Sequence, residues 1–201
     1  MQSPLDIVVM SAGKGTRMKS SRPKVLHRLA GRALVLHVLD TAARLNSRNV
    51  VVVTGHGADE VEAALADALC APVFARQLPQ LGTGHAVQQA VPLLPDDGMV
   101  LVLSGDVPLI AEDTLRALIA AAAADGERLA LLTIEFDDPT GYGRILRAPD
   151  SGRVLAIVEQ KDADAAQRAV REVYSGIMAV PARLLKPWLA RLDNRNAQGE
   201  Y

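Results

Sequence analysis

The sequence of 201 residues contains one cysteine, few aromatic residues (3%) and almost no net charge (−1). Because Cys70 has no partner in the chain, no internal disulfide can form, which is typical of proteins from a reducing compartment. A net charge near zero provides no general field that would attract nucleic acid or an anionic membrane, so we expect neither as a partner. Phosphate groups would have to be held by local cations and backbone N–H groups.

Long hydrophobic runs are also missing. The first apolar run, Ile7–Met10, is far too short for a signal peptide or a membrane span, so we expect a cytoplasmic protein. The composition, 49% hydrophobic and 22% charged, is ordinary for a globular protein. The length suffices for one domain with a substantial core.

Short β-branched runs alternate along the chain with longer stretches rich in alanine and leucine. The predicted strands are Asp6–Met10, Asn49–Thr54, Pro72–Arg76, Met99–Ser104, Leu129–Phe136 and Val154–Glu159. The predicted helices are Leu34–Leu45, Ala58–Leu69, Gly84–Val91 and Glu112–Ala124. The early strands are continuous apolar runs, as in strands covered on both faces. The pattern predicts an α/β fold with a Rossmann-like, mostly parallel sheet and helices on both faces.

The second half of the chain changes character. A turn-rich stretch at 137–143 and a turn at Pro149–Gly152 predict an antiparallel addition to the sheet, and a helix is expected around Ala182–Leu192. The last nine residues, Asp193–Tyr201, are polar and contain no predicted helix or strand. They suggest either a frayed end or a domain interrupted in mid-course.

A glycine-containing loop, Ser11–Met18, follows the first strand. Glycines let the backbone approach a ligand and turn its N–H groups toward phosphate oxygens, and this loop leaves the carboxyl end of a strand, where such folds bind ligands. Arg17 and Lys24 would add the positive charge that a triphosphate needs. A dinucleotide fingerprint would need glycine in place of Met18, and a Walker loop would need glycine in place of Val8. Both of those alternatives are therefore excluded.

Two further segments carry polar side chains next to glycines. Gln77 and Thr83 could read the donor and acceptor edge of a pyrimidine, although a plain loop with Thr83 as helix N-cap is the simpler explanation when that segment is taken alone. Asp106 leaves the carboxyl end of a predicted buried strand and is well placed to hold Mg²⁺ against phosphate. A role for Asp106 as N-cap of the next helix is less natural, because Pro108 intervenes before Glu112.

The motif Gly13–Met18, followed by Pro23–His27, resembles the signature of sugar-1-phosphate nucleotidyltransferases. Together with Leu81–Ala86, it is most similar to the N-acetylglucosamine-1-phosphate uridyltransferases of bacterial UDP-N-acetylglucosamine synthesis. The motifs follow the family order over essentially the whole chain. Five residues in three segments depart from the usual family residues: Met10-Ser11 replaces Leu-Ala, Ser104 replaces Tyr, and Tyr174-Ser175 replaces Asn-Thr.

The resemblance implies a nucleotide-diphospho-sugar transferase-like fold, Mg²⁺ as cofactor, and UTP and N-acetylglucosamine 1-phosphate as substrates. It implies that the catalytic residues are Arg17, Lys24 and Asp106, with Asp106 also the metal ligand. The implied nucleotide-binding residues are Met10, Ser11, Ala12, Gly13, Gly15, Lys24, Gln77, Gly82, Thr83 and Gly105. The implied sugar-phosphate-binding residues are Ser104, Gly143, Glu159, Tyr174 and Ser175.

The implied reaction is attack of the sugar phosphate on the α-phosphorus of UTP, with release of pyrophosphate. Within a single domain over 1–201, incomplete at its C-terminal end, residues 1–110 would bind the nucleotide and 111–201 the sugar phosphate. Longer family members continue with a second Mg²⁺-binding Asn and a β-helix acetyltransferase that forms a homotrimer, so the resemblance suggests a partial chain. Two alternatives stay open: a related enzyme using another nucleotide or hexose 1-phosphate, and a truncated domain that binds nucleotide without turnover.

Overall fold

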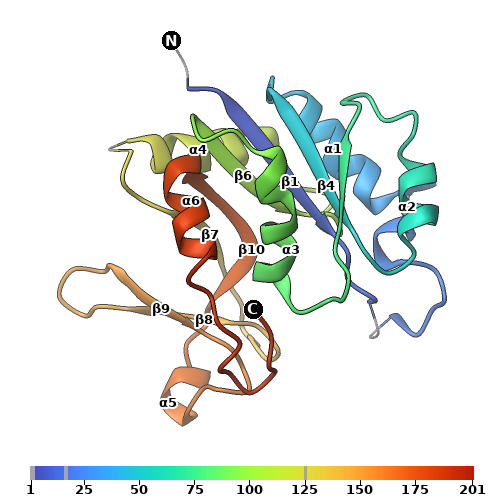
Figure 1. Cartoon of the computed structure of the whole chain (residues 1–201). Helices are drawn as coiled ribbons and strands as arrows, with labels where there is room; N and C mark the ends of the chain where they lie inside the picture. Colours follow the sequence, from blue (N-terminus) through green and yellow to red (C-terminus); the bar gives the residue numbers. More distant parts are fainter. Residues whose placement is uncertain (1–2, 16–17, 125) are drawn as a thin grey trace.

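The computed structural model describes residues 3–15, 18–124 and 126–201 (Figure 1). The strands are β1 (Leu5–Ser11), β2 (Arg28–Leu29), β3 (Arg32–Ala33), β4 (Asn49–Thr54), β5 (Val73–Arg76), β6 (Met99–Ser104), β7 (Ala130–Glu135), β8 (Arg144–Arg147), β9 (Val154–Val158) and β10 (Glu172–Pro181). The helices are α1 (Leu34–Ala43), α2 (Ala58–Ala64), α3 (Thr83–Ala90), α4 (Glu112–Ala123), α5 (Ala165–Arg168) and α6 (Ala182–Leu189), with 3₁₀ turns η2 (Lys24–Leu26) and η3 (Val91–Leu93).

Eight of the described strands form one sheet in the order β5-β4-β1-β6-β10-β8-β9, with β7 also paired to β10. The strands β5, β4, β1 and β6 run parallel to one another. The apolar residues of β1, β4 and β6 are mostly buried on both sides, as the continuous runs in the sequence predict, whereas Val73 in the edge strand β5 is exposed. Strands β2 and β3 form a separate hairpin.

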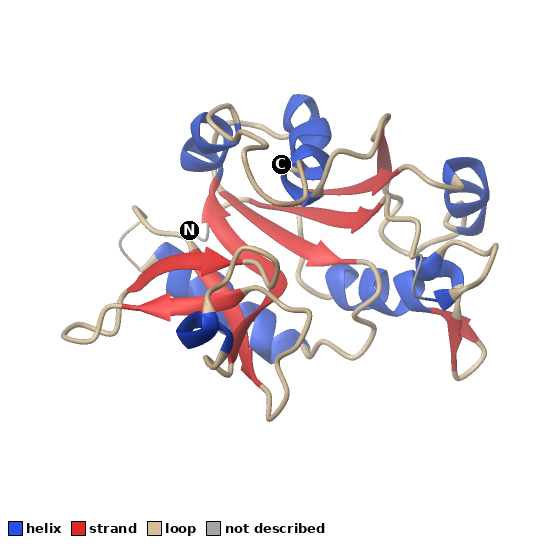
Figure 2. Ribbon diagram, turned by 90° about the horizontal axis from the view of Figure 1, so that it is seen from below, coloured by secondary structure: helices blue, strands red, loops and turns tan. Residues whose placement is uncertain are grey.

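Helices cover both faces of this parallel half (Figure 2). The core on one face contains buried side chains of α1, α2 and α4, together with Ile7 and Val9 of β1. The core on the other face contains side chains of α3 and α6, together with Val8 of the same strand. The predicted α/β class is therefore confirmed.

Within the described ranges, no helix combines the length and the hydrophobicity needed to cross a bilayer.

The remaining strands form the predicted antiparallel addition. Strand β10 lies beside β6 and runs antiparallel to it, and β8 and β9 continue the sheet below, next to α5 (Figure 1). The pairing of β10 with β7 shifts register between Tyr174 and Met178, and Gly176 within this bulge has φ 84°. A positive φ suits glycine, so Gly176 allows the strand to bend at the seam between the two halves of the sheet.

Candidate active site

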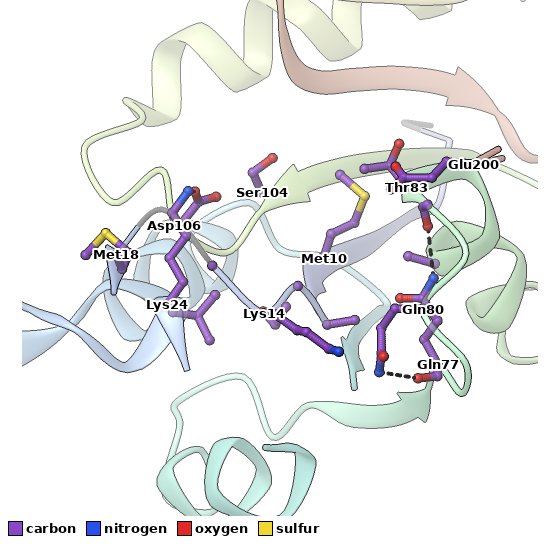
Figure 3. A pocket seen from close by; sticks show the side chains of 17 residues that line it. Met10, Lys14, Met18, Lys24, Gln77, Gln80, Thr83, Ser104, Asp106 and Glu200 are labelled. Atoms are coloured by element: carbon purple, nitrogen blue, oxygen red, sulfur yellow. Dashed lines mark hydrogen bonds and ion pairs between the residues drawn. The ribbon is translucent and has the colours of Figure 1, made fainter. Parts of the chain in front are cut away.

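A cavity of about 830 Å³ opens at the carboxyl ends of β1 and β6 (Figure 3). These two strands are parallel neighbours in which Met10 pairs with Ser104, so the loops that follow them leave the sheet at the same edge. The volume is within the range of small-molecule sites. The cavity is lined by Met10, Ser11, Ala12, Gly13, Lys14, Gly15, Met18, Lys24, Val25, Gln77, Gln80, Gly82, Thr83, Ala86, Ser104, Asp106 and Glu200.

The glycine loop lies along one wall of the cavity. Gly15 has φ 61°, and a Cβ at this position would lie 2.6 Å from the Cβ of Lys24, so only glycine lets the loop approach Lys24 this closely. The loop also contributes Lys14, which the sequence did not single out. The predicted catalytic residue Arg17 lies outside the described residues, and its role stays a prediction.

Gly105 is close to the cavity but does not line it. Its backbone N–H donates to the carbonyl of Met10 at 3.0 Å, and a Cβ at this position would overlap the Oγ of Ser11. The absence of a side chain at Gly105 therefore allows the loop after β6 to lie against the end of β1. This close approach brings Asp106 next to the glycine loop.

Lys24 and Asp106 form an ion pair at this junction. Lys24 is the first residue of η2, and Asp106 follows β6. Their side chains are 34% and 26% exposed, so both remain accessible to a ligand in the cavity. The capping alternative for Asp106 is wrong: α4 begins at Glu112, and its N-cap position is Ala111.

The donor atoms at this site decide whether a metal ion fits there. In the described part of the chain, no group of three or more His, Cys, Asp or Glu side chains could hold a metal ion. Asp106 therefore belongs to no cluster of metal ligands, and the other carboxylate at the cavity wall is Glu200. Mg²⁺ in nucleotide sites is usually held by one or two carboxylates together with substrate phosphates and water. The site therefore fits a cation that binds with a nucleotide, and it is not a preformed metal cage.

Gln77 anchors the opposite wall. Its side chain is only 3% exposed, and its Nε2 donates to the carbonyl of Gly82 at 2.9 Å and lies 3.1 Å from Nδ1 of His85. Nδ1 of His85 therefore accepts in this arrangement. Among the described residues no group donates to the amide oxygen of Gln77, which leaves an acceptor for a ligand. Gln80, which the sequence did not single out, also lines the cavity, and its Nε2 donates to the backbone carbonyl of Gln77 at 3.1 Å.

Thr83 is the first residue of α3. The cap position is Gly82, and no side chain caps this helix, so the alternative in which Thr83 is the N-cap is wrong. The Thr83 side chain is exposed and lines the cavity. Its hydroxyl is consequently in a position to meet a ligand.

A second cluster contains Gly143, Glu159 and Tyr174, none of which lines the cavity. The backbone N–H of Tyr174 donates to the carbonyl of Gly143 at 3.0 Å, and a Cβ on Gly143 would lie 2.9 Å from Oε1 of Glu159. Ser104 connects the two regions: it lines the cavity, and its Oγ lies 2.9 Å from the position that a Cβ would take on Gly176.

Ser175 plays a structural part beside this cluster. Its hydroxyl donates to the carbonyl of Leu132 in β7 at 2.7 Å and accepts from the N–H of Ile177 at 3.3 Å. The hydroxyl hydrogen is thus used within the sheet, where it stabilises the bulge of β10. The structure gives no support to a direct contact between Ser175 and a sugar phosphate.

Arg144 is a site residue that the sequence did not single out. It is 1% exposed, and its guanidinium donates to the carbonyl of Tyr142, to Oε1 of Gln160 at 2.7 Å and to the carbonyl of Arg168 at 3.4 Å. These contacts fix the turn that contains Gly143. The sequence offered one signal for this role: an arginine follows the glycines at 141 and 143 and begins an apolar strand.

Glu159 of the second cluster has two further carboxylates nearby, Asp162 and Glu200. Partial desolvation of Glu159, with Asp162 and Glu200 nearby, raises the pKa of Glu159, and Arg144 opposes this effect. Burial also raises the pKa of Tyr174, so its phenol stays neutral. The glycine-loop wall instead carries Lys14 and Lys24. Phosphates are therefore expected at the lysine end and hydroxyl-bearing groups at the carboxylate end.

Comparisons with known proteins identify relatives of the chain. The family model described as MobA-like NTP transferase domain matches residues 7–193. The chain is 69% identical over 202 residues to the bifunctional protein GlmU of Albidiferax ferrireducens, covering 98% of this chain and 43% of that protein. It is 56% identical over 199 residues to the protein of the same name from Marinobacter nauticus, covering 99% of this chain and 43% of that protein.

Among solved structures, one described as a glucose-1-phosphate thymidylyltransferase from Bacillus anthracis is similar in fold, with a TM-score of 0.79 and 17% identity, covering 98% of this chain and 78% of that one. A nucleotidyl transferase from Methanothermobacter has a TM-score of 0.63 and 24% identity, covering 94% and 77%. The chain spans less than half the length of the curated relatives that it matches. The match over residues 7–193 shows that the chain belongs to the MobA-like NTP transferase family.

Proposed function

We propose that the chain transfers a uridylyl group from UTP to N-acetylglucosamine 1-phosphate, giving UDP-N-acetylglucosamine and pyrophosphate. The observation that carries the proposal is the single cavity in which the glycine loop, Lys24, Asp106 and the loop from Gln77 to Thr83 converge. The high identity to the GlmU proteins across nearly the whole chain supports it. The motifs that resemble uridyltransferases lie within this shared region.

The chemistry follows from the charges around the cavity. Lys14, Lys24 and the N–H groups of the glycine loop would hold the triphosphate of UTP. A phosphate oxygen of the sugar 1-phosphate attacks the α-phosphorus, and the bond from this phosphorus to pyrophosphate breaks with its electron pair. The attacking phosphate is already ionised at neutral pH, so no general base is needed. The protein contributes in-line positioning and charge stabilisation.

Asp106 would hold Mg²⁺ together with the phosphates of the nucleotide. When bound there, the ion supplies charge neutralisation on the phosphate oxygens. When the phosphates bind, the Lys24 ammonium group would turn from Asp106 toward the phosphate oxygens. The exchange is inexpensive, since ion pairs that are partly exposed to water contribute only about 0–1 kcal/mol.

Gln77 is proposed to select the base. Its amide oxygen is left free by the contacts of Nε2 with Gly82 and His85, so it can accept the N3–H of uracil. Cytosine has an acceptor at N3 and would leave that oxygen facing another lone pair. The backbone of Gly82 and the hydroxyl of Thr83 would complete the contacts with the base.

The second cluster is proposed to bind the acceptor sugar. Gly143 would present a backbone N–H to the N-acetyl group, and the carboxylate of Glu159 would accept from a sugar hydroxyl. Tyr174, beside Gly143, would pack against the sugar in place of the Asn usual in the family. Residues 1–110 would thus supply the nucleotide part and 111–201 the sugar part of the site.

A second candidate is transfer to a different hexose 1-phosphate. Tyr174 favours it, because a bulky neutral phenol replaces a small amide at the proposed sugar site. We also propose that the protein is cytoplasmic. A homotrimer is proposed only for the longer family members, which carry the β-helix.

A substrate panel scored by pyrophosphate release tests these proposals. UTP, CTP, dTTP and ATP are each combined with N-acetylglucosamine 1-phosphate, glucose 1-phosphate and N-acetylgalactosamine 1-phosphate in the presence of Mg²⁺. We expect the highest kcat/KM for UTP with N-acetylglucosamine 1-phosphate. A clear preference for another hexose phosphate would establish the second candidate. Binding of UTP in calorimetry without turnover for any pair would show a binding domain instead of an enzyme.

A further inference from the structure

The tail, residues 193–201, lies against the loop that carries the proposed base-reading groups. The backbone N–H of Tyr201 donates to the carbonyl of Leu81 at 2.7 Å, and the backbone N–H of Gly84 donates to the carbonyl of Tyr201 at 2.9 Å. The rings of Tyr201 and His85 are 6.3 Å apart. Figure 1 shows this end of the chain beside the start of α3. The tail therefore holds the loop from both sides of Gly82.

The glycines of this loop have no room for a side chain because of the tail. A Cβ on Gly82 would lie 2.5 Å from the carbonyl oxygen of Tyr201, and a Cβ on Gly84 would lie 2.9 Å from the carbonyl carbon of Tyr201. Real Cβ atoms do not approach other heavy atoms this closely. The packing of the tail therefore requires a residue without a side chain at positions 82 and 84. The motif at 81–86 thus has a structural reason in addition to its proposed contact with the base.

Asn196 gives the tail its shape. Its Oδ1 accepts from the N–H of Gln198 at 3.1 Å and from the N–H of Glu200 at 3.3 Å, and its Nδ2 donates to the carbonyl of Glu200. One side chain therefore closes the turn that directs Glu200 and Tyr201 toward the loop.

The tail is also attached to the sugar side of the site. The N–H of Ala197 donates to Oδ1 of Asp162 at 3.0 Å, and Glu200 lines the cavity. Glu200 and Asp162 both raise the pKa of Glu159. The tail consequently spans from the segment after β9 to the loop before α3, across the side of the cavity where the two proposed subsites meet.

We propose that the tail is a strap that positions the base-reading loop at 81–84, with Asn196 as its positioning residue. The proposal rests on the proposed function in so far as this loop binds the nucleotide base. If the strap holds the loop in its binding shape, a loosened strap lowers the fraction of protein that is competent to bind nucleotide. The apparent affinity for nucleotide then falls, while the groups at the reacting phosphates are unchanged.

The test compares Asn196→Ala with Asn194→Ala, a matched control in the same exposed segment. No described residue forms a hydrogen bond with the Asn194 side chain. Gly84→Ala is a second variant, because the added Cβ displaces the tail without touching the cavity. The readouts are KM for UTP, kcat, the melting temperature, and amide hydrogen exchange of the peptide covering residues 81–86.

We expect Asn196→Ala and Gly84→Ala to raise the KM for UTP about tenfold, to change kcat by less than about threefold, and to speed exchange at 81–86. The melting temperature should stay near that of the wild type, and Asn194→Ala should behave as the wild type. Unchanged exchange in both variants would show that the tail does not hold the loop. Faster exchange with an unchanged KM would show that holding the loop does not assist binding. Exchange needs no substrate, so a wild type inactive with UTP would reject the proposed function separately.

Discussion

Lys24 and Asp106 form an ion pair at the edge of the cavity, joining the turn η2 to the loop after β6. Sequence reasoning had assigned both residues to one triphosphate site, and the structure places them in direct contact. The pair neutralises two opposite charges at the cavity wall. Each partner is partly exposed, so each can exchange the other for a ligand group.

Lys24→Ala should lower turnover by roughly 10²–10³, the scale expected for loss of one preorganised electrostatic donor. The loss should persist at saturating substrate, because the ammonium group is proposed to act on charge that develops in the transition state. Steady-state kinetics with pyrophosphate detection measures it. Arg28→Ala, which removes an exposed cation outside this cavity, is the control. Turnover near the wild-type value would remove Lys24 from the catalytic role.

Asp106→Asn should raise the Mg²⁺ concentration needed for half-maximal activity at least about tenfold, because the amide is a neutral and weaker ligand for a hard cation. Chelation of divalent cations should abolish wild-type activity, and added Mg²⁺ should restore it. Calorimetry with UTP in the presence of chelator should show binding to the variant at least as tight as to the wild type, since a negative charge beside the phosphates is gone. An unchanged Mg²⁺ requirement would argue against Asp106 as the metal ligand.

Glu159→Gln should keep or raise the stability of the fold at pH 7 and weaken the binding of the sugar 1-phosphate. A carboxyl whose pKa is raised in the folded state binds protons more strongly there than in the unfolded chain. The ionised form of Glu159 therefore lowers the stability of the fold. This destabilisation is absent below the ordinary pKa of 4.5 and grows as the pH rises through the raised pKa.

The glutamine variant should accordingly be at least as stable as the wild type at pH 7, and the two should converge below about pH 4.5. Its KM for the sugar 1-phosphate should rise, because a carboxylate acceptor is lost. Thermal melts between pH 4 and 8 measure the first effect. A variant that is less stable at pH 7, with a gap that narrows on acidification, would contradict the stated direction of the pKa shift.

Arg144→Met should destabilise the fold by about 2–3 kcal/mol, because a buried cation is removed and the groups that accept its hydrogen bonds lose their donor. The turn that holds Gly143 should loosen, so the KM for the sugar 1-phosphate should rise more than the KM for UTP. Arg144→Lys should rescue little, since an ammonium group cannot reproduce the planar donor set. Denaturant titration and the two KM values test this. Equal changes in both KM values would show that Arg144 does not act on the sugar side.

The first and last residues of the four parallel strands could be predicted from the sequence to within one residue. Strands β1, β4 and β6 are buried on both faces and therefore appear as nearly uninterrupted apolar runs. Strand β10 was not predicted, because Tyr174, Ser175 and Gly176 interrupt its apolar pattern where the strand bulges. The predicted helix Ala58–Leu69 ends at Ala64 instead, because the chain must turn toward β5 despite its alanine-rich composition.

The candidate site was predictable where its residues follow directly after strands. The glycine loop, Lys24, Asp106 and the Gln77–Thr83 loop are short motifs, and the topology brings them to one edge. Arg144 and Glu200 were missed because their neighbours in space are distant in the sequence. Arg144 contacts Gln160 and Arg168, and Glu200 lines a cavity whose other lining residues lie between positions 10 and 106. No local pattern marks contacts of this kind.

The most direct measurement is the formation of UDP-N-acetylglucosamine by this chain from UTP, N-acetylglucosamine 1-phosphate and Mg²⁺, in parallel with Lys24→Ala and Asp106→Asn. If one cavity holds the triphosphate between these two residues, the wild type forms the product and releases an equal amount of pyrophosphate. Lys24→Ala is then slowed at least about a hundredfold, and Asp106→Asn is slowed at a Mg²⁺ concentration that is half-maximal for the wild type. Product formation at the same rate by all three proteins would contradict the account.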